Sequence, residues 1–88
     1  MDVRKQRPAL GLHTVQERVD ALAMAREAFK AGEQAVKGGA PLEVAFYVGY
    51  LKSLSDLANQ EHAVDLYTDL DLLRSRLEES LQEMLGLV

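Results

Sequence analysis

The chain has 88 residues, of which 48% are hydrophobic and 27% are charged, and its formal net charge at pH 7 is −4. This length supports one hydrophobic core, and the composition is that of a globular protein rather than a disordered one. The sequence contains no cysteine, which excludes a disulfide framework and a zinc site with cysteine ligands.

The sequence predicts neither a membrane-spanning segment nor a secretory signal. The longest uncharged apolar run, residues 44–51, is far shorter than the roughly 20 residues that a transmembrane helix needs. Arg4, Lys5 and Arg7 are not followed by the apolar segment of a signal peptide. We therefore expect a cytoplasmic protein that does not act in a membrane.

The N-terminal residues differ in pattern from the rest of the chain. Residues 1–13 contain Pro8 and Gly11 and show no helical period, so we expect a flexible basic arm. Residues 14–88 are expected to form a single helical domain.

The first helix is predicted over residues 14–37. Thr14 and Glu17 have the spacing of a capping box, in which each side chain accepts a hydrogen bond from the backbone N–H of the other residue. After this segment, Gly38 favours the end of a helix and Pro41 prevents its simple continuation.

Two apolar stripes run along the length of this first helix. The bulky stripe consists of Val15, Val19, Leu22, Phe29 and Val36. The small-residue stripe consists of Ala21, Ala25, Ala28, Gly32 and Ala35. Together they cover more than one neighbouring helix needs, so we expect surplus apolar surface, although alanine is also a good helix former on a surface.

The second helix is predicted over residues 41–58. Pro41 suits the first helical position, and Glu43 lies favourably at the positive end of the helix dipole. The segment 44–51 is apolar almost all round, which predicts a central helix that is covered on both sides. Gly49 within it predicts the close approach of a neighbouring helix.

The third helix is predicted over residues 62–85 and ends at Gly86. No glycine or proline separates it from the second helix, but the apolar stripe shifts by roughly 100° round the helix. We therefore expect a break between Asn59 and His62, with Asn59 as the best candidate for the left-handed conformation. One continuous bent helix and a later start at Thr68 are the alternatives.

Apolar residues recur along the third helix at alternating spacings of four and three. This seam consists of Leu66, Leu70, Leu73, Leu77, Met84 and Leu87, with Ser80 as its one polar position. Such spacing is typical of a helix that packs against another helix. We expect an all-α, antiparallel three-helix arrangement that dimerises through helix packing.

The sequence provides no motif for catalysis, for a cofactor or for a metal. His62 lies close to Glu61 and Asp65, but acidic residues are common at a helix start, and the Glu-x-x-His pairs of di-iron bundles are missing. No serine has a base nearby in the sequence, and Gly38 is not followed by the lysine and hydroxyl of a phosphate-binding loop. We expect a protein that is not an enzyme and that needs neither cofactor nor metal.

The favoured function is that of a non-enzymatic helical protein–protein interaction module, such as a small adaptor, a cochaperone or a phage-type accessory or inhibitor protein. Tyrosine is enriched at interaction hot spots, and helical seams are common contact surfaces. The candidate partner-contact residues are Tyr47, Tyr50, Tyr67, Leu66, Leu70, Leu73, Leu77 and Met84. The expected partners are a second copy of the chain and another protein.

The alternative function is that of a nucleic-acid-associated regulator that uses the basic arm. Arg4, Lys5 and Arg7 are able to contact phosphates. However, residues 59–88 carry seven acidic side chains against two basic ones, which is unfavourable for a DNA-recognition helix.

One stretch has a familiar arrangement. From Arg18 to Leu54, two predicted helices are joined by Gly-Gly-Ala-Pro-Leu-Glu. This stretch resembles the helical hairpins of small type III secretion cochaperones and of the helical domain in tRNA-modifying GTPases. The resemblance covers less than half of the chain and implies a helical hairpin, without assigning a role to any residue.

Overall fold

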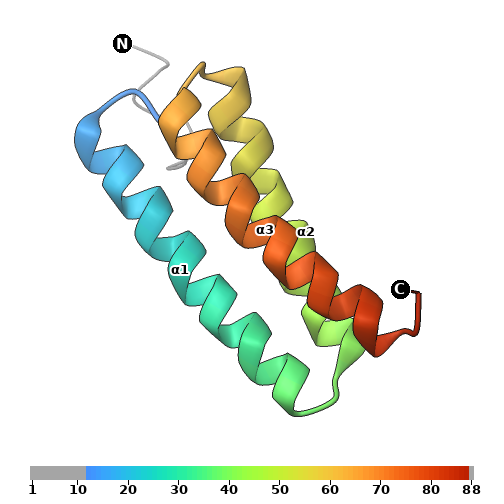
Figure 1. Cartoon of the computed structure of the whole chain (residues 1–88). Helices are drawn as coiled ribbons and strands as arrows, with labels where there is room; N and C mark the ends of the chain where they lie inside the picture. Colours follow the sequence, from blue (N-terminus) through green and yellow to red (C-terminus); the bar gives the residue numbers. More distant parts are fainter. Residues whose placement is uncertain (1–11, 88) are drawn as a thin grey trace, which may run out of the picture.

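The computed structural model describes residues 12–87. They form three helices, α1 (Val15–Lys37), α2 (Pro41–Gln60) and α3 (Val64–Met84), and each helix packs against the other two. The chain runs down along α1, up along α2 and down again along α3, so α1 and α3 are parallel and α2 is antiparallel to both (Figure 1). The predicted all-α three-helix arrangement is confirmed. Residues 1–11 of the predicted basic arm lie outside the described residues.

The start of α1 has the predicted capping box. The Glu17 N–H donates to Thr14 Oγ1 over 3.0 Å, and the Thr14 N–H donates to Glu17 Oε1 over 3.0 Å. The hydrogen bond from the Thr14 backbone is the main reason that the pKa of the Glu17 carboxyl group is lowered from its ordinary value. These bonds fix the residue at which α1 begins.

The turn between α2 and α3 separates the two helices, but not at the predicted residue. His62 adopts the left-handed conformation, with a φ of 58°, whereas Asn59 lies inside α2. The Ala63 N–H donates to the Ala58 carbonyl over 2.9 Å, and the His62 N–H donates to the Asn59 carbonyl over 3.1 Å. Because backbone groups close this turn, it needs no asparagine side chain, and the prediction of Asn59 was wrong.

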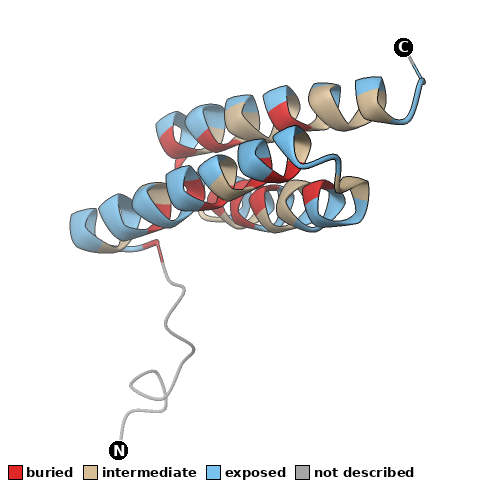
Figure 2. Cartoon of the chain, turned by 90° about the horizontal axis from the view of Figure 1, so that it is seen from below, coloured by how far each residue is buried: buried red, intermediate tan, exposed pale blue. Residues whose placement is uncertain are grey.

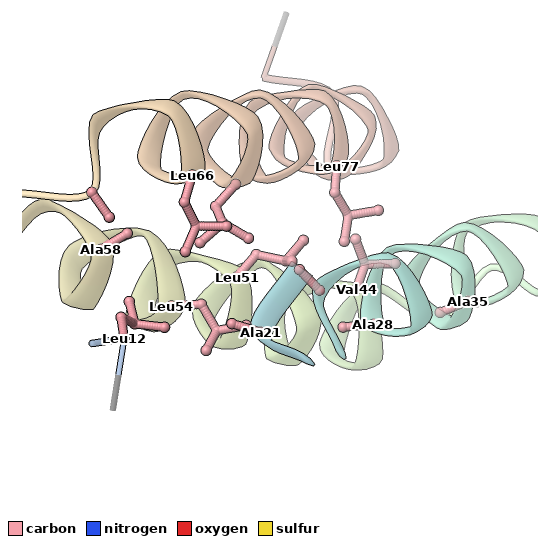
Figure 3. Close-up of a cluster of buried hydrophobic side chains, with 13 residues drawn as sticks. Leu12, Ala21, Ala28, Ala35, Val44, Leu51, Leu54, Ala58, Leu66 and Leu77 are labelled. Atoms are coloured by element: carbon pink, nitrogen blue, oxygen red, sulfur yellow. The ribbon is translucent and has the colours of Figure 1, made fainter. Parts of the chain in front are cut away.

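The core lies between one face of each helix, as Figure 2 shows by the buried side of every ribbon. From α1 it takes the small-residue stripe: Ala21, Ala25, Ala28, Gly32 and Ala35 are all buried. From the other two helices it takes mainly leucine, valine and alanine side chains, including Val44, Leu51, Leu54, Leu66 and Leu77 (Figure 3). The small side chains of α1 therefore face the large ones of its two neighbours.

A neighbouring helix approaches closely at Gly32 and not at Gly49. A Cβ atom built on Gly32 would lie 3.0 Å from Leu77 Cδ1 and closer still to Cδ2, which is less than real Cβ contacts show. A Cβ atom on Gly49 would meet nothing within 4 Å. The expectation of a close neighbour at Gly49 was wrong, because this glycine lies on the exposed side of α2.

The burial of α2 on nearly all sides was also predicted wrongly. Leu42 is 87% exposed and Phe46 is 66% exposed. In a bundle of three helices, α1 and α3 both pack against the same side of α2, and its other side is left in contact with solvent. This difference matters for function because it leaves apolar side chains on the surface of α2.

The end of the predicted arm is held against the bundle. Leu12 is 1% exposed and belongs to the core, and its carbonyl accepts a hydrogen bond from Arg18 Nε over 3.0 Å. The neighbouring His13 Nε2 lies 3.3 Å from Glu61 Oε1, at the end of α2. The bundle therefore includes two residues that precede the capping box.

Candidate interaction site

Most of the seam predicted as a partner surface on α3 is used inside the chain. Leu66, Leu70 and Leu77 are buried in the core, and Leu73 and Met84 are partly buried against it. Tyr67 is also partly buried against the core. These side chains hold α3 on its neighbours.

A groove between α1 and α2, here called the aromatic groove, contains two of the predicted tyrosines. Its volume is about 480 Å³, and its lining residues include Met24, Glu27, Ala31, Phe46, Tyr47 and Tyr50. The rings of Phe46 and Tyr47 meet edge to face, with their centroids 5.1 Å apart. The groove thus combines aromatic side chains from α2 with aliphatic ones from α1.

A second groove, here called the parallel groove, runs between α1 and α3. One hollow of about 490 Å³ is lined by residues that include Val15, Val19, Leu22 and Val64. An adjoining hollow of about 170 Å³ is lined by residues that include Leu22 and Leu72. Because Leu22 and Asp69 line both hollows, the two form one continuous groove along the parallel helices.

The sequence did not predict several of the exposed apolar residues that line these grooves. Phe46 belongs to the segment that was predicted to be covered on both sides, and Val64 and Leu72 were not part of any predicted surface. The bulky stripe of α1 was the available signal, since Val15 and Val19 are 79% and 54% exposed. The stripe showed surplus apolar surface, but its direction depends on how α1 is rotated in the bundle.

The described residues provide little else for chemistry. Among residues 12–87, no group of three or more histidine, aspartate and glutamate side chains is placed to hold a metal ion. The Ser53 hydroxyl donates to the Gly49 carbonyl over 3.0 Å, within its own helix. Arg74 is paired with Asp71 over 3.0 Å and with Glu78, and the hydrogen bond to Asp71 raises the pKa of Arg74.

None of the helices in the described part of the chain is long and apolar enough to cross a membrane. Comparisons of the chain with protein-family models, with curated proteins and with solved structures found no match. The two grooves beside α1 are therefore the basis for an assignment of function.

Proposed function

We propose that this chain is a non-enzymatic, cytoplasmic protein–protein interaction module that forms a homodimer and holds an apolar helix of another protein in the aromatic groove. The corresponding roles are those of a small adaptor, a cochaperone or a phage-type accessory or inhibitor protein. The aromatic groove is the observation that carries this proposal.

The aromatic groove has the features of a helix-binding surface. Single exposed apolar residues are normal, but contiguous ones are typical of interaction sites. Phe46 is 66% exposed beside Tyr47 and Tyr50, and Leu42, one helical turn before Phe46, is 87% exposed. An amphipathic helix places anchors at spacings of three and four residues into such a groove. Tyrosine supports these contacts because it buries a large area while its hydroxyl group stays solvated.

The charge beside the groove indicates the chemistry of the partner. Glu27 is the one residue that is charged at pH 7 among those described as lining the groove. A partner helix with a lysine or arginine next to its apolar face would place a cation beside this carboxylate. The expected ligand is therefore an amphipathic helix with apolar anchors and a basic flank.

The test is affinity capture from native host cells with the wild-type chain, with Phe46→Glu and with Leu85→Glu as a matched control. Leu85 is 51% exposed beyond the end of α3 and lines neither groove. We expect a protein that is retained by the wild-type and control chains and lost with Phe46→Glu. Equal retention by all three chains, or no specific protein at all, would contradict the proposal.

The alternative, a nucleic-acid-associated regulator, would act through Arg4, Lys5 and Arg7, which lie outside the described residues. Phosphate contacts weaken steeply between about 50 and 200 mM salt, whereas an apolar helix contact does not. Fluorescence anisotropy with labelled duplex DNA and RNA separates the two functions. Binding that falls steeply with salt and is lost on Arg4→Ala/Arg7→Ala would favour the alternative.

A further inference from the structure

The parallel groove is bordered by large apolar side chains that the described chain leaves uncovered. Val15 and Val64 are 79% and 69% exposed near its N-terminal end, and Leu72 is 51% exposed further along α3. These residues lie on both sides of one groove rather than at scattered positions. A continuous apolar area of this kind is typical of a surface that binds another protein.

The two sides of this groove carry opposite charges. Arg18 and Arg26 line it from α1, whereas Asp65 and Asp69 line it from α3. Among the described residues, none of these four side chains forms an ion pair with another described residue. The α1 side of the groove is therefore cationic where the α3 side is anionic.

The sign of the charge reverses on both sides further along the helices. Glu33 follows Arg26 by seven residues, and Arg76 follows Asp69 by seven residues. Seven residues are about two helical turns, so each pair lies near one line along its helix. Glu33 and Arg76 are both exposed. Glu33 and Arg76 lie beyond the residues that line the two hollows, and there too the α1 side and the α3 side carry opposite charges.

We propose that the occupant of the parallel groove is the same groove of a second copy, related by a two-fold axis that runs along it. The assignment rests on the proposed homodimer and names its surface. Because α1 and α3 are parallel, this rotation places α1 of one copy opposite α3 of the other at the same level. Arg18 and Arg26 then face the segment of the second copy that carries Asp65 and Asp69.

An isologous dimer requires a surface that is complementary to itself. With the axis along the groove, the arginines of α1 in each copy lie opposite the aspartates of α3 in the other copy. Unlike charges that face each other at an interface are favourable for association.

The size of the surface indicates a dimer of moderate affinity. Two helices side by side are about 20 Å wide, and a helix of about 20 residues is about 30 Å long. The whole face then covers at most about 600 Å² per copy, or about 1,200 Å² in total, which is the lower limit for a specific interface, and the two hollows occupy its part over residues 15–26 and 62–73. We expect dissociation in the micromolar range.

The first experiment is sedimentation analysis of the wild-type chain from about 1 to about 200 μM. We expect a reversible monomer–dimer equilibrium. Its dissociation constant should rise with salt, because salt screens the four Arg–Asp attractions across the interface. A dimer that salt strengthens would overturn the proposed orientation.

The second experiment uses two charge-reversed chains, Arg18→Glu/Arg26→Glu and Asp65→Lys/Asp69→Lys. Each should dimerise at least about tenfold more weakly than the wild type, because like charges then meet across the interface. An equimolar mixture should regain the dimer, since Glu faces Lys on one side and Asp faces Arg on the other. Native mass spectrometry identifies this heterodimer because the two chains differ in mass.

Two controls separate the interface from charge and folding effects. Lys37→Glu/Lys52→Glu makes the same change in net charge as Arg18→Glu/Arg26→Glu, on exposed residues outside the groove, and should dimerise like the wild type. Val64→Gln changes a side chain that is 69% exposed, so its melting temperature at about 1 μM should match that of the wild-type monomer, while its dimer weakens. If a charge-reversed chain does not fold, the dimerisation of Val64→Gln decides whether the parallel groove is the interface.

The outcomes distinguish the surface from the dimer itself. A wild-type chain that stays monomeric up to about 200 μM would overturn both the homodimer and its assigned surface. A dimer that is unaffected by Val64→Gln and by both charge reversals would leave the homodimer standing and overturn the parallel groove as its interface. Neither result would change the test of the aromatic groove.

Discussion

The two apolar stripes of α1 differ in how far they are buried. The small-residue stripe, which includes Ala25, is buried, whereas Val15 and Val19 of the bulky stripe are exposed. Side-chain size alone would place the larger residues inside, where they bury more apolar area. The bundle instead buries the small ones because they allow the leucines of α2 and α3 to approach the α1 backbone closely. Val15 and Val19 are then free for contacts outside the chain, whereas Leu22, Phe29 and Val36 are partly buried against the core.

The largest loss of stability is expected when a large side chain that packs against the small-residue stripe is shortened. Leu77 is 1% exposed and reaches the α1 backbone at Gly32. Leu77→Ala should lower the free energy of unfolding by about 2–5 kcal/mol, because it removes buried methyl groups and leaves a cavity. Chemical denaturation monitored by circular dichroism measures this loss. A loss below about 1 kcal/mol would show that α1 does not pack as closely as described.

Gly32→Ala tests the same contact. Its effect on the free energy of unfolding should change sign according to which residue at position 77 faces it. In the wild type, overpacking of about 1–3 kcal/mol against Leu77 opposes a helix-propensity gain of about 1 kcal/mol. We expect a net loss of about 1 kcal/mol in the wild type and a gain of about 1 kcal/mol in Leu77→Ala. A double-mutant cycle gives both values, and equal effects in the two backgrounds would contradict direct contact.

A polar substitution on each stripe tests their difference in burial. Val19→Ser should change the stability of the monomer by less than about 0.5 kcal/mol, since the side chain is 54% exposed. Ala25→Ser should cost about 1 kcal/mol or more, since it adds a hydroxyl group at a position that is 0% exposed. Thermal melts at low protein concentration compare the two chains. The reverse order would mean that α1 is rotated differently.

The smallest effect is expected at the capping box, which sets where both stripes begin. The pKa of Glu17 is lower in the folded chain than its ordinary value. Its carboxylate therefore stabilises the fold above the ordinary pKa, and this contribution is lost as the pH falls through the lowered one. Melting temperatures of the wild type and Glu17→Gln should differ slightly at pH 7 and converge under acidic conditions. A difference that grows on acidification would contradict this sign.

The sequence was sufficient to predict the helices, but not the residue at the turn between α2 and α3 or the side of each helix that stays exposed. Capping residues and the phase of the apolar stripes are local signals, so the helices ended within two residues of their predicted bounds. The left-handed residue was missed because a turn closed by backbone hydrogen bonds accepts His62 in place of Asn59. The groove positions were missed because the exposure of Phe46 depends on which side of α2 its neighbours cover, and this is a property of the whole bundle.

The most direct test of the account is the reactivity of a single thiol on the bulky stripe. The chain has no cysteine, so Val19→Cys and an exposed control outside both grooves, Asp56→Cys, each carry one thiol. At about 1 μM both should react equally fast with a thiol reagent, and at about 200 μM the reaction of Val19→Cys should slow as the dimer covers it. A thiol at position 19 that is protected at every concentration, or at none, would contradict the outward direction of the stripe or its role in the dimer.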